Sequence, residues 1–409
     1  MNAGPVQVGW RRGEPLAELV EREWLVTNGL GGYAAGTIGG VCTRRFHGKL
    51  IAALPAPLGR TMMLNHLEEH LVAPDGTTWL LSGDESGRAV TYPNPEFLEE
   101  FVLECGVPVW RFSGGGIRLE KRVVMPNAQN TTWIIYRLLE GPQGLALRLR
   151  PSLNFRAHEG LLGEPAKGWT VRTDGANIEI AESASHPPLR LAIVGRSAGL
   201  DVEPQDVEQV IYRLEKSRGY EHEGPLWSPG VIHLALERDA DAALVASVEP
   251  WAVVQAMTLA DVLATDGARR NRLLSMAGNA AGDDIAAQLV LAADQFLIAP
   301  RTRAADEARM AAAGDSPRTV IAGYHWFTDW GRDTMISLEG LTLTTGRHNE
   351  ARAILQTFAH HIRDGLIPNL FPEGAHEGLY HTADATLWFF HAMDRYLVYS
   401  SDVPFLSEL

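Results

Sequence analysis

The spacing of apolar residues changes along this chain, from a period of two to a period near 3.6, at about residue 280. Between about residues 24 and 250, apolar and polar residues alternate in runs such as "TTWIIYRLL" (131–139), and clusters of Gly, Pro, Asn and Asp separate the runs. Alternation of this kind predicts antiparallel strands with one buried face. Beyond about residue 280, apolar residues recur at i, i+3, i+4 and i+7, which predicts amphipathic helices. We therefore expect a β domain followed by helices.

The domain boundaries follow from this change of period. At 409 residues the chain is longer than one hydrophobic core usually serves. We expect a β-sandwich domain over 1–262 and a helical domain over 283–409. The small, polar and weakly periodic segment 263–282 is expected to link them. Four helices are predicted in the second domain, at 283–298, 334–345, 349–365 and 383–400.

Charge and composition exclude several classes of partner. The formal net charge is −14, and binding to a phosphate backbone depends on clustered Lys and Arg, so we expect neither nucleic acid nor an anionic membrane as a partner. No run of 18 apolar residues occurs, and Cys42 and Cys105 are the only cysteines. Two cysteines are too few for a disulfide framework and suit a reducing compartment, so a cytoplasmic protein is expected. No feature of the sequence indicates an oligomeric state.

Two motifs in the β region resemble cofactor or metal sites without meeting their requirements. "HLEEH" (66–70) has the spacing of a zinc motif, but its flanks fit a strand as well as a helix, and that chemistry requires a helix and a third ligand. The glycine-rich "NGLGGYAAGTIGG" (28–40) lacks the acidic residue that a dinucleotide site needs about 20 positions later, because no Asp or Glu lies between Glu23 and Glu68. We expect no metal and no cofactor.

The stretch "HWFTDWGRDT" (325–334) concentrates two tryptophans, two carboxylates and a guanidinium in ten residues. Its glycine disfavours a continuous helix, so we expect a loop over 329–332 and a helix capped by Asp333 or Thr334. In one interpretation, Asp333 is only an N-cap and the tryptophans are only packing.

In the other interpretation, this stretch binds a sugar. Arg332 and Asp333 would offer a donor and an acceptor at the start of a helix, with an indole beside them. Sugars favour that combination, since an aromatic face covers C–H groups while charged side chains bond to hydroxyls. The helix that begins near Asp384 also follows an aromatic and acidic loop. For Asp384, an N-cap role and a ligand role are both open.

Three stretches together resemble the glycogen debranching enzymes of bacteria and archaea. "WLVTNGLGGYAAGTIGGVCTRRFHGKLIAAL" (24–54) resembles the opening of that family, and "GYEHEGPLWSPG" (219–230) resembles a later motif of its N-terminal domain. The segment that begins "HWFTDWGRDTMISLEG" (325–340) and continues to "YHTADATLWFFHAMDRY" (380–396) resembles the start of its amylo-α-1,6-glucosidase domain. The two unrelated sets of motifs occur in the family's order.

The resemblance implies an N-terminal antiparallel β-supersandwich followed by an (α/α)6 barrel. It implies hydrolysis of α-1,6-linked glucose at branch points of glycogen or limit dextrin, by an inverting mechanism with two carboxyl groups. Trp330, Arg332 and Asp333 match the family's W-x-R-D signature, in which the Arg–Asp pair holds the terminal glucose. The further substrate contacts that we expect are Asp384, Trp326 and Asp329.

The sequence also departs from the family. Twelve helices of about 11 residues with short loops need roughly 200 residues, and 283–409 is shorter, so we expect only the first helices of an incomplete barrel. The family's acid and base have no counterpart here, and we expect them beyond Leu409, as in a C-terminally truncated enzyme. Two alternatives stay open: an inactive carbohydrate-binding remnant, and a glucoamylase-like or trehalase-like (α/α)6 hydrolase.

Overall fold

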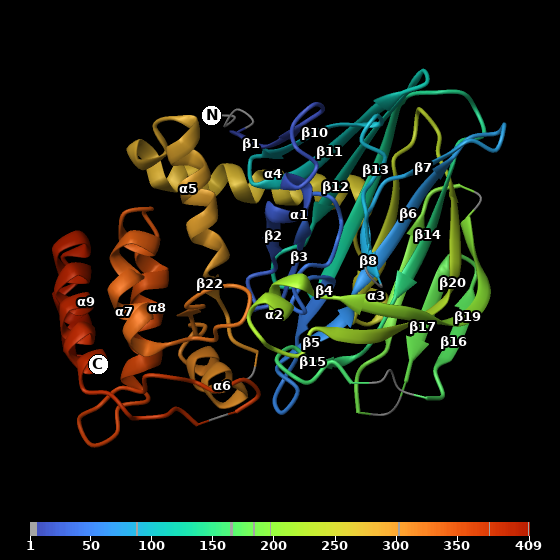
Figure 1. Ribbon diagram of the computed structural model, residues 1–409. Coiled ribbons are helices and arrows are strands. Elements are labelled where there is room, and N and C mark those ends of the chain that lie inside the picture. Colours follow the sequence, from blue (N-terminus) through green and yellow to red (C-terminus); the bar gives the residue numbers. More distant parts are fainter. Residues whose placement is uncertain are drawn as a thin grey trace.

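The fold has two regions, strands and helices, which lie side by side in the computed structural model of the chain (Figure 1). The structure describes residues 6–86, 89–163, 167–182, 185–196, 198–301, 303–375, 377–407 and 409. The strands come almost entirely from the first 247 residues, and most of the helical residues come from the remainder. The predicted order, an antiparallel β region followed by helices, is confirmed.

The β region contains a nine-stranded sheet in which all neighbouring strands are antiparallel. Its β13 strand coincides with the alternating run that begins at Thr131. In spatial order the strands are β1 (Val6–Arg11), β10 (Leu98–Glu104), β11 (Val107–Gly114), β12 (Ile117–Val124), β13 (Thr131–Glu140), β21 (Ala242–Ser247), β18 (Leu189–Val194), β17 (Asn177–Ala181) and β16 (Thr170–Asp174).

Two further antiparallel sheets complete this region. The seven-stranded sheet contains β7 (Thr78–Leu80), β6 (His66–Val72), β14 (Ala146–Ser152), β20 (Glu223–Ala235), β19 (Ala198–Ile211), β8 (Asp84–Ser86) and β9 (Ala89–Thr91). The five-stranded sheet contains β15 (Arg156–Ala157), β5 (Arg60–Leu64), β4 (Gly48–Ala53), β3 (Tyr33–Thr37) and β2 (Glu23–Thr27). Two short helices, α1 (Glu18–Glu21) and α2 (Arg213–Ser217), lie between strands in sequence.

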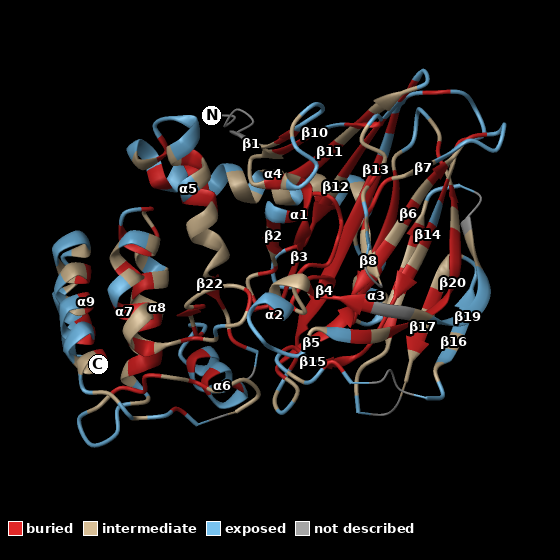
Figure 2. Cartoon of the chain, in the orientation of Figure 1, coloured by how far each residue is buried: buried red, intermediate tan, exposed pale blue. Residues whose placement is uncertain are grey.

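The inner faces of the sheets share one hydrophobic core, which Figure 2 shows as buried strand residues. Leu67 and Leu71 of β6 contribute from one sheet, and Leu119 and Ile134 contribute from the nine-stranded sheet. Full burial of such a side chain stabilises the fold by about 1.5–3 kcal/mol. Because β6 alternates, the intervening positions point to the other face of its sheet. The "HLEEH" motif is therefore on a strand.

The segment 263–282, predicted as a linker, is mostly helical. After α3 (Trp251–Val254), helix α4 runs over Leu259–Ala277, followed by a 3₁₀ turn at Gly278–Ala281. A capping box starts α4, and Val262 packs with the outer face of the nine-stranded sheet. The sequence pattern did not indicate this helix because few of its positions are buried, so its apolar periodicity is weak. That 263–282 separates two domains stays a prediction.

The predicted helices are present in the second region. They correspond to α5 (Asp284–Gln295), α7 (Gly331–Leu338) with a π-helical extension (Glu339–Leu343), α8 (His348–Ala359) and α9 (Asp384–Ser400). The sequence interpretation missed α6 (Ala304–Ala312), the β22–β23 pair (Leu297–Ile298 and Thr319–Val320), and a final 3₁₀ turn (Val403–Ser407). A second core joins α7, α8 and α9. Among the described residues, no helix combines the length and apolar character that a membrane crossing requires.

Arg60, on β5, joins the two regions. Its side chain is 3% exposed. Its Nε donates to Oε2 of Glu373 over 2.8 Å, while Nη1 donates to the carbonyl of His325 over 3.0 Å and Nη2 to that of Phe327 over 2.9 Å. The backbone N–H of Arg60 donates to Oε1 of the same glutamate over 2.7 Å. One buried guanidinium thus holds the segment that leads into α7.

Candidate functional site

The start of α7 is the point around which the candidate site is built. The helix begins at Gly331, after Trp330, and the N-cap residue forms no side-chain capping bond. Its first two amides bond to Asn369: the N–H of Gly331 donates to the Asn369 carbonyl over 3.0 Å, and the N–H of Arg332 donates to Oδ1 over 3.1 Å. Glycine is required because a Cβ at this position would lie 2.2 Å from the carbonyl oxygen of Pro368.

The predicted loop over 329–332, with Asp333 or Thr334 as the cap, is therefore wrong in its bounds. The capping group comes from Asn369, 37 positions further along the chain, so the helix begins earlier than a local cap would place it. A cap that comes from a distant loop leaves no signal in the residues that precede the helix. The start of α7 is consequently fixed by tertiary contacts.

The loop that carries Asn369 runs alongside the residues that lead into α7. Trp330 pairs with Leu370 in an isolated antiparallel bridge. The N–H of Phe371 donates to the carbonyl of Asp329 over 3.3 Å. This loop therefore positions the backbone of the whole turn into α7.

Arg332 and Asp384 bring the starts of α7 and α9 together. Nη1 of Arg332 lies 3.0 Å from Oδ2 of Asp384, and the two side chains are 43% and 47% exposed. The hydrogen bond from Arg332, with its charge, lowers the pKa of Asp384, and the same contact raises the pKa of Arg332. An ion pair this exposed adds little to stability. Its effect is to hold a carboxylate and a guanidinium at one solvent-facing point.

Asp333 lies beside this pair, on the wall of a separate hollow of about 370 Å³. The hollow is mainly apolar, and its lining includes Phe296, Ile336 and Leu341. Arg332 and Asp333 are adjacent on a helix, so their side chains leave it in different directions. The structure thus pairs Arg332 with Asp384, while Asp333 borders the hollow.

The two tryptophans of the motif have different surroundings. Trp330 precedes α7 and packs edge-on against Phe327, with ring centroids 6.2 Å apart. Trp326 instead contacts the β region: Arg218 lies 4.9 Å from its ring centroid, and the Phe46 ring lies 5.7 Å away. Trp326 therefore packs at the junction of the two regions.

Asp329 is buried below the site. It is 7% exposed, and its Oδ2 lies 2.8 Å from Nη2 of Arg303. Burial raises the pKa of this carboxyl. Arg303 also lies 3.6 Å from Asp306, which accepts a hydrogen bond over 2.8 Å in its contact with His361. This network supports the loop beneath the site, and it keeps Asp329 away from the surface.

One group among the described residues has the composition of a metal site. Glu23, His47 and His325 place one ligand atom each within 4.8 Å of one another. Burial lowers the pKa of both histidines, that of His325 to about 3. However, Nε of Arg44 donates to the Glu23 carboxylate over 2.7 Å, and the Arg44 backbone N–H faces Nδ1 of His47 at 3.4 Å. The carboxylate thus already has a cationic partner, and we assign no metal here.

Comparison with known proteins gives matches over both regions. Residues 22–243 match the family described as "Glycogen debranching enzyme N terminal", and residues 291–409 match "Amylo-alpha-1,6-glucosidase". The glycogen debranching enzyme of Saccharomyces cerevisiae is 44% identical over 89 residues, which cover 20% of this chain and only 6% of the yeast protein.

A solved structure of a bacterial glucoamylase complexed with acarbose aligns with 97% of this chain and 56% of its own, at 10% identity and a TM-score of 0.43. The stronger findings are the two family matches, of which the first alone covers more than half of the chain. They lie in the order that the sequence motifs indicated. This chain therefore belongs to the glycogen debranching enzyme family.

Proposed function

We propose that this chain serves the hydrolysis of α-1,6-linked glucose at branch points of glycogen or limit dextrin. The match of residues 291–409 to the amylo-α-1,6-glucosidase family supports this activity. We infer the position of the site from the contact between Arg332 and Asp384 at the starts of α7 and α9. We assign to this pair, with Trp330 and Asp333, the binding of a terminal glucose.

The geometry of the Arg332–Asp384 pair supports the binding of a sugar, because the pair is ordered and yet accessible to solvent. Asn369 fixes the backbone of Arg332, and the guanidinium has five N–H donors, so donors remain after the contact with Asp384. The Asp384 carboxylate likewise keeps lone pairs free. Neighbouring hydroxyls of a pyranose can accept from Arg332 and donate to Asp384 at the same time.

The hollow beside Asp333 offers an apolar surface, which complements the polar contacts of the Arg332–Asp384 pair. Its apolar side chains, Phe296, Ile336 and Leu341, can cover the C–H groups of a sugar ring while the Asp333 carboxylate accepts from a hydroxyl. A volume of about 370 Å³ lies within the range of small-ligand sites. The two parts of the site thus suit the polar edge and the apolar face of glucose.

These residues suit binding better than proton transfer. In an inverting mechanism a neutral carboxyl group protonates the leaving oxygen, and a carboxylate roughly 6.5–9.5 Å away activates water. Arg332 lowers the pKa of Asp384, so that carboxyl is ionised and accepts hydrogen bonds. Asp329 is buried against Arg303. We therefore assign the proton-donating acid to neither side chain.

Binding of limit dextrin, and glucose release from it, test the assignment in the wild-type chain and in Asp384→Asn. Loss of a charged hydrogen bond to the sugar should weaken binding by about tenfold to a hundredfold. Asp394→Asn is the matched control, since Asp394 is an exposed residue of the same helix. Equal affinities for limit dextrin in Asp384→Asn and wild type would refute the site.

The same assay separates the two alternative functions. Binding of limit dextrin without glucose release would indicate a carbohydrate-binding protein. Faster hydrolysis of maltosyl than of isomaltosyl substrates would indicate a glucoamylase-like enzyme. Preference for the isomaltosyl substrate supports the proposed α-1,6 specificity.

A further inference from the structure

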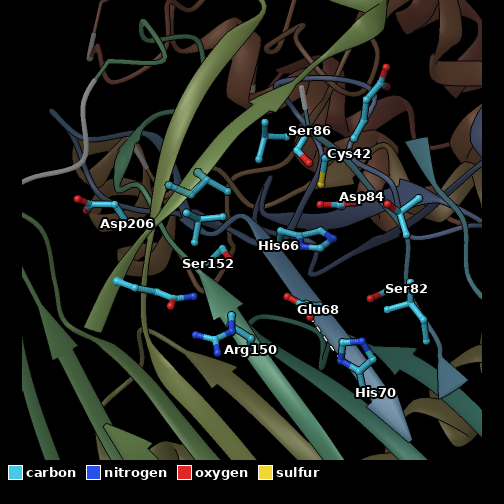
Figure 3. A pocket seen from close by; sticks show the side chains of 17 residues that line it. Cys42, His66, Glu68, His70, Ser82, Asp84, Ser86, Arg150, Ser152 and Asp206 are labelled. Atoms are coloured by element: carbon cyan, nitrogen blue, oxygen red, sulfur yellow. Dashed lines mark ion pairs between the residues drawn. The ribbon is translucent and has the colours of Figure 1, made fainter. Parts of the chain in front are cut away.

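A second and larger hollow lies on the β region, with a volume of about 440 Å³ (Figure 3). Among the described residues, its lining comes from positions between Cys42 and Leu226 and from none in the helical region. Leu67, Glu69 and Leu71 of β6 are buried in the core, while the alternate residues His66, Glu68 and His70 line the hollow. The hollow therefore opens on the face of the seven-stranded sheet that points away from the core.

The strand pairing sets polar side chains next to each other across this face. Ser152 and Arg150 of β14 lie opposite His66 and Glu68 of β6. Figure 3 shows these residues around the hollow, with Asp206 of β19 on the other side. Strands that cover a core with one face usually leave the other face to solvent. Here that polar face is instead hollowed into a concave surface.

Arg150 is the unusual member of this surface. Its Nη1 atom is buried, and within the described residues it has no hydrogen-bond partner. Glu68 lies opposite in the register, but the ion pair of Glu68 is with Nδ1 of His70, at 3.4 Å. A buried guanidinium N–H without an acceptor costs free energy, so an acceptor from outside the chain is favoured at this position.

The other lining groups limit which class of ligand can supply that acceptor. Among the described residues, four carboxylates line the hollow, and only one of them, Glu85, has an arginine partner, Arg213, at 2.7 Å. A phosphate or a carboxylate ligand would be repelled by the remaining charges. Hydroxyl groups both donate and accept, so a neutral, hydroxyl-rich ligand can satisfy Arg150 and the carboxylates together. Val207, Val210 and Leu226 add apolar contacts for C–H groups.

We propose that this hollow is a second carbohydrate-binding site, which holds a segment of an α-glucan chain away from the site at α7. The α-glucan identity of the ligand rests on the proposed function. Because the lining includes no residue of the helical region, the site anchors the polymer and takes no part in glucose release. Arg150 is its central donor.

Isothermal titration of the full chain with maltoheptaose tests the proposal, in an Arg332→Ala background that weakens binding at the α7 site. Removing the donor with Arg150→Ala should weaken the remaining affinity by about tenfold. Arg148→Ala is the matched control: Arg148 is exposed on the same strand, two residues away, and does not line the hollow. Circular dichroism and melting curves establish that each variant is folded.

Arg150→Lys, which keeps the charge without the planar fork, should restore part of the lost affinity. Equal affinities in Arg150→Ala and Arg148→Ala would overturn the proposal, and so would heat of binding with Ca²⁺ but not with maltoheptaose. Hydrolysis is scored separately, with a short isomaltosyl substrate that needs no anchor. If that activity is absent while Arg150→Ala still weakens maltoheptaose binding, the proposed function fails and the second site stands.

Discussion

The β region and the helical region cover their apolar surfaces in different ways. The nine-stranded sheet is covered on both faces, by the shared inner core on one side and by α3 and α4 on the other. Helix α9 buries one side against α7 and α8, whereas Leu387, Phe390 and Val398 are 69%, 59% and 62% exposed. Single exposed apolar residues are ordinary, but three on one helix face form a patch. Stability in the helical region therefore depends on a thinner core.

Arg60→Ala should have the largest effect, because it removes the link between the two regions. It removes the guanidinium that donates to Oε2 of Glu373 and to two carbonyls, and loss of one partner of a buried ion pair costs about 4 kcal/mol. We expect calorimetry to resolve two melting transitions in the variant. Arg118→Ala breaks only an exposed pair with Glu140 and should melt like the wild type.

Leu355→Ala tests the thinner core of the helical region. Leu355 is fully buried in α8, so its truncation should cost about 3 kcal/mol in the free energy of unfolding. Leu387→Ala, on the exposed face of α9, should cost little. Urea unfolding of both variants measures the difference, and equal losses would mean that the exposed face of α9 is covered in solution.

Acid should weaken the junction through His325. Burial lowers the pKa of His325 from 6.5 to about 3, so the folded chain holds this imidazole neutral. Its contribution to stability is complete above pH 6.5 and is lost as the pH falls from 6.5 towards 3. The melting temperature should therefore fall between pH 7 and pH 4. The fall should be smaller in His325→Phe and unchanged in His381→Phe, which alters an exposed histidine.

Thr258→Ala should have the smallest effect, on the helix that connects the regions. The Thr258 hydroxyl accepts from the N–H of Asp261 over 3.2 Å, and loss of such a cap costs about 1 kcal/mol. Thr265→Ala, at an exposed interior position of α4, should be neutral or slightly stabilising. A Thr258→Ala variant as stable as Thr265→Ala in urea unfolding would show that α4 is held by packing alone.

Periodicity predicted the elements whose burial repeats along the chain. The run at Thr131 became β13, and the run over 349–365 became α8, because one face of each is buried at regular intervals. Helix α4 gave a weaker signal, since only Val262, Leu273, Leu274 and Ala277 are buried in it. The β6 strand could not be separated from a helix by local pattern.

The features that periodicity did not predict depend on contacts between residues that are distant in the sequence. Arg332, in the motif over 325–334, meets Asp384, although the two residues are 52 positions apart. Asn369, which starts α7, and the Arg60–Glu373 pair, 313 positions apart, left no local pattern. Trp326 and Asp329 were predicted as substrate contacts from their place in the same motif, and that role stays a prediction. Their surroundings, the β region and Arg303, are set by tertiary packing.

The bonds from Asn369 also determine what kind of molecule the α7 site can select. The start of a helix commonly binds anions through its free amides, but the amides of Gly331 and Arg332 are already occupied. At the proposed sugar site, those two amides are therefore not available to a ligand. A phosphorylated sugar would gain no binding from them, so they would not favour a sugar phosphate over unmodified glucose.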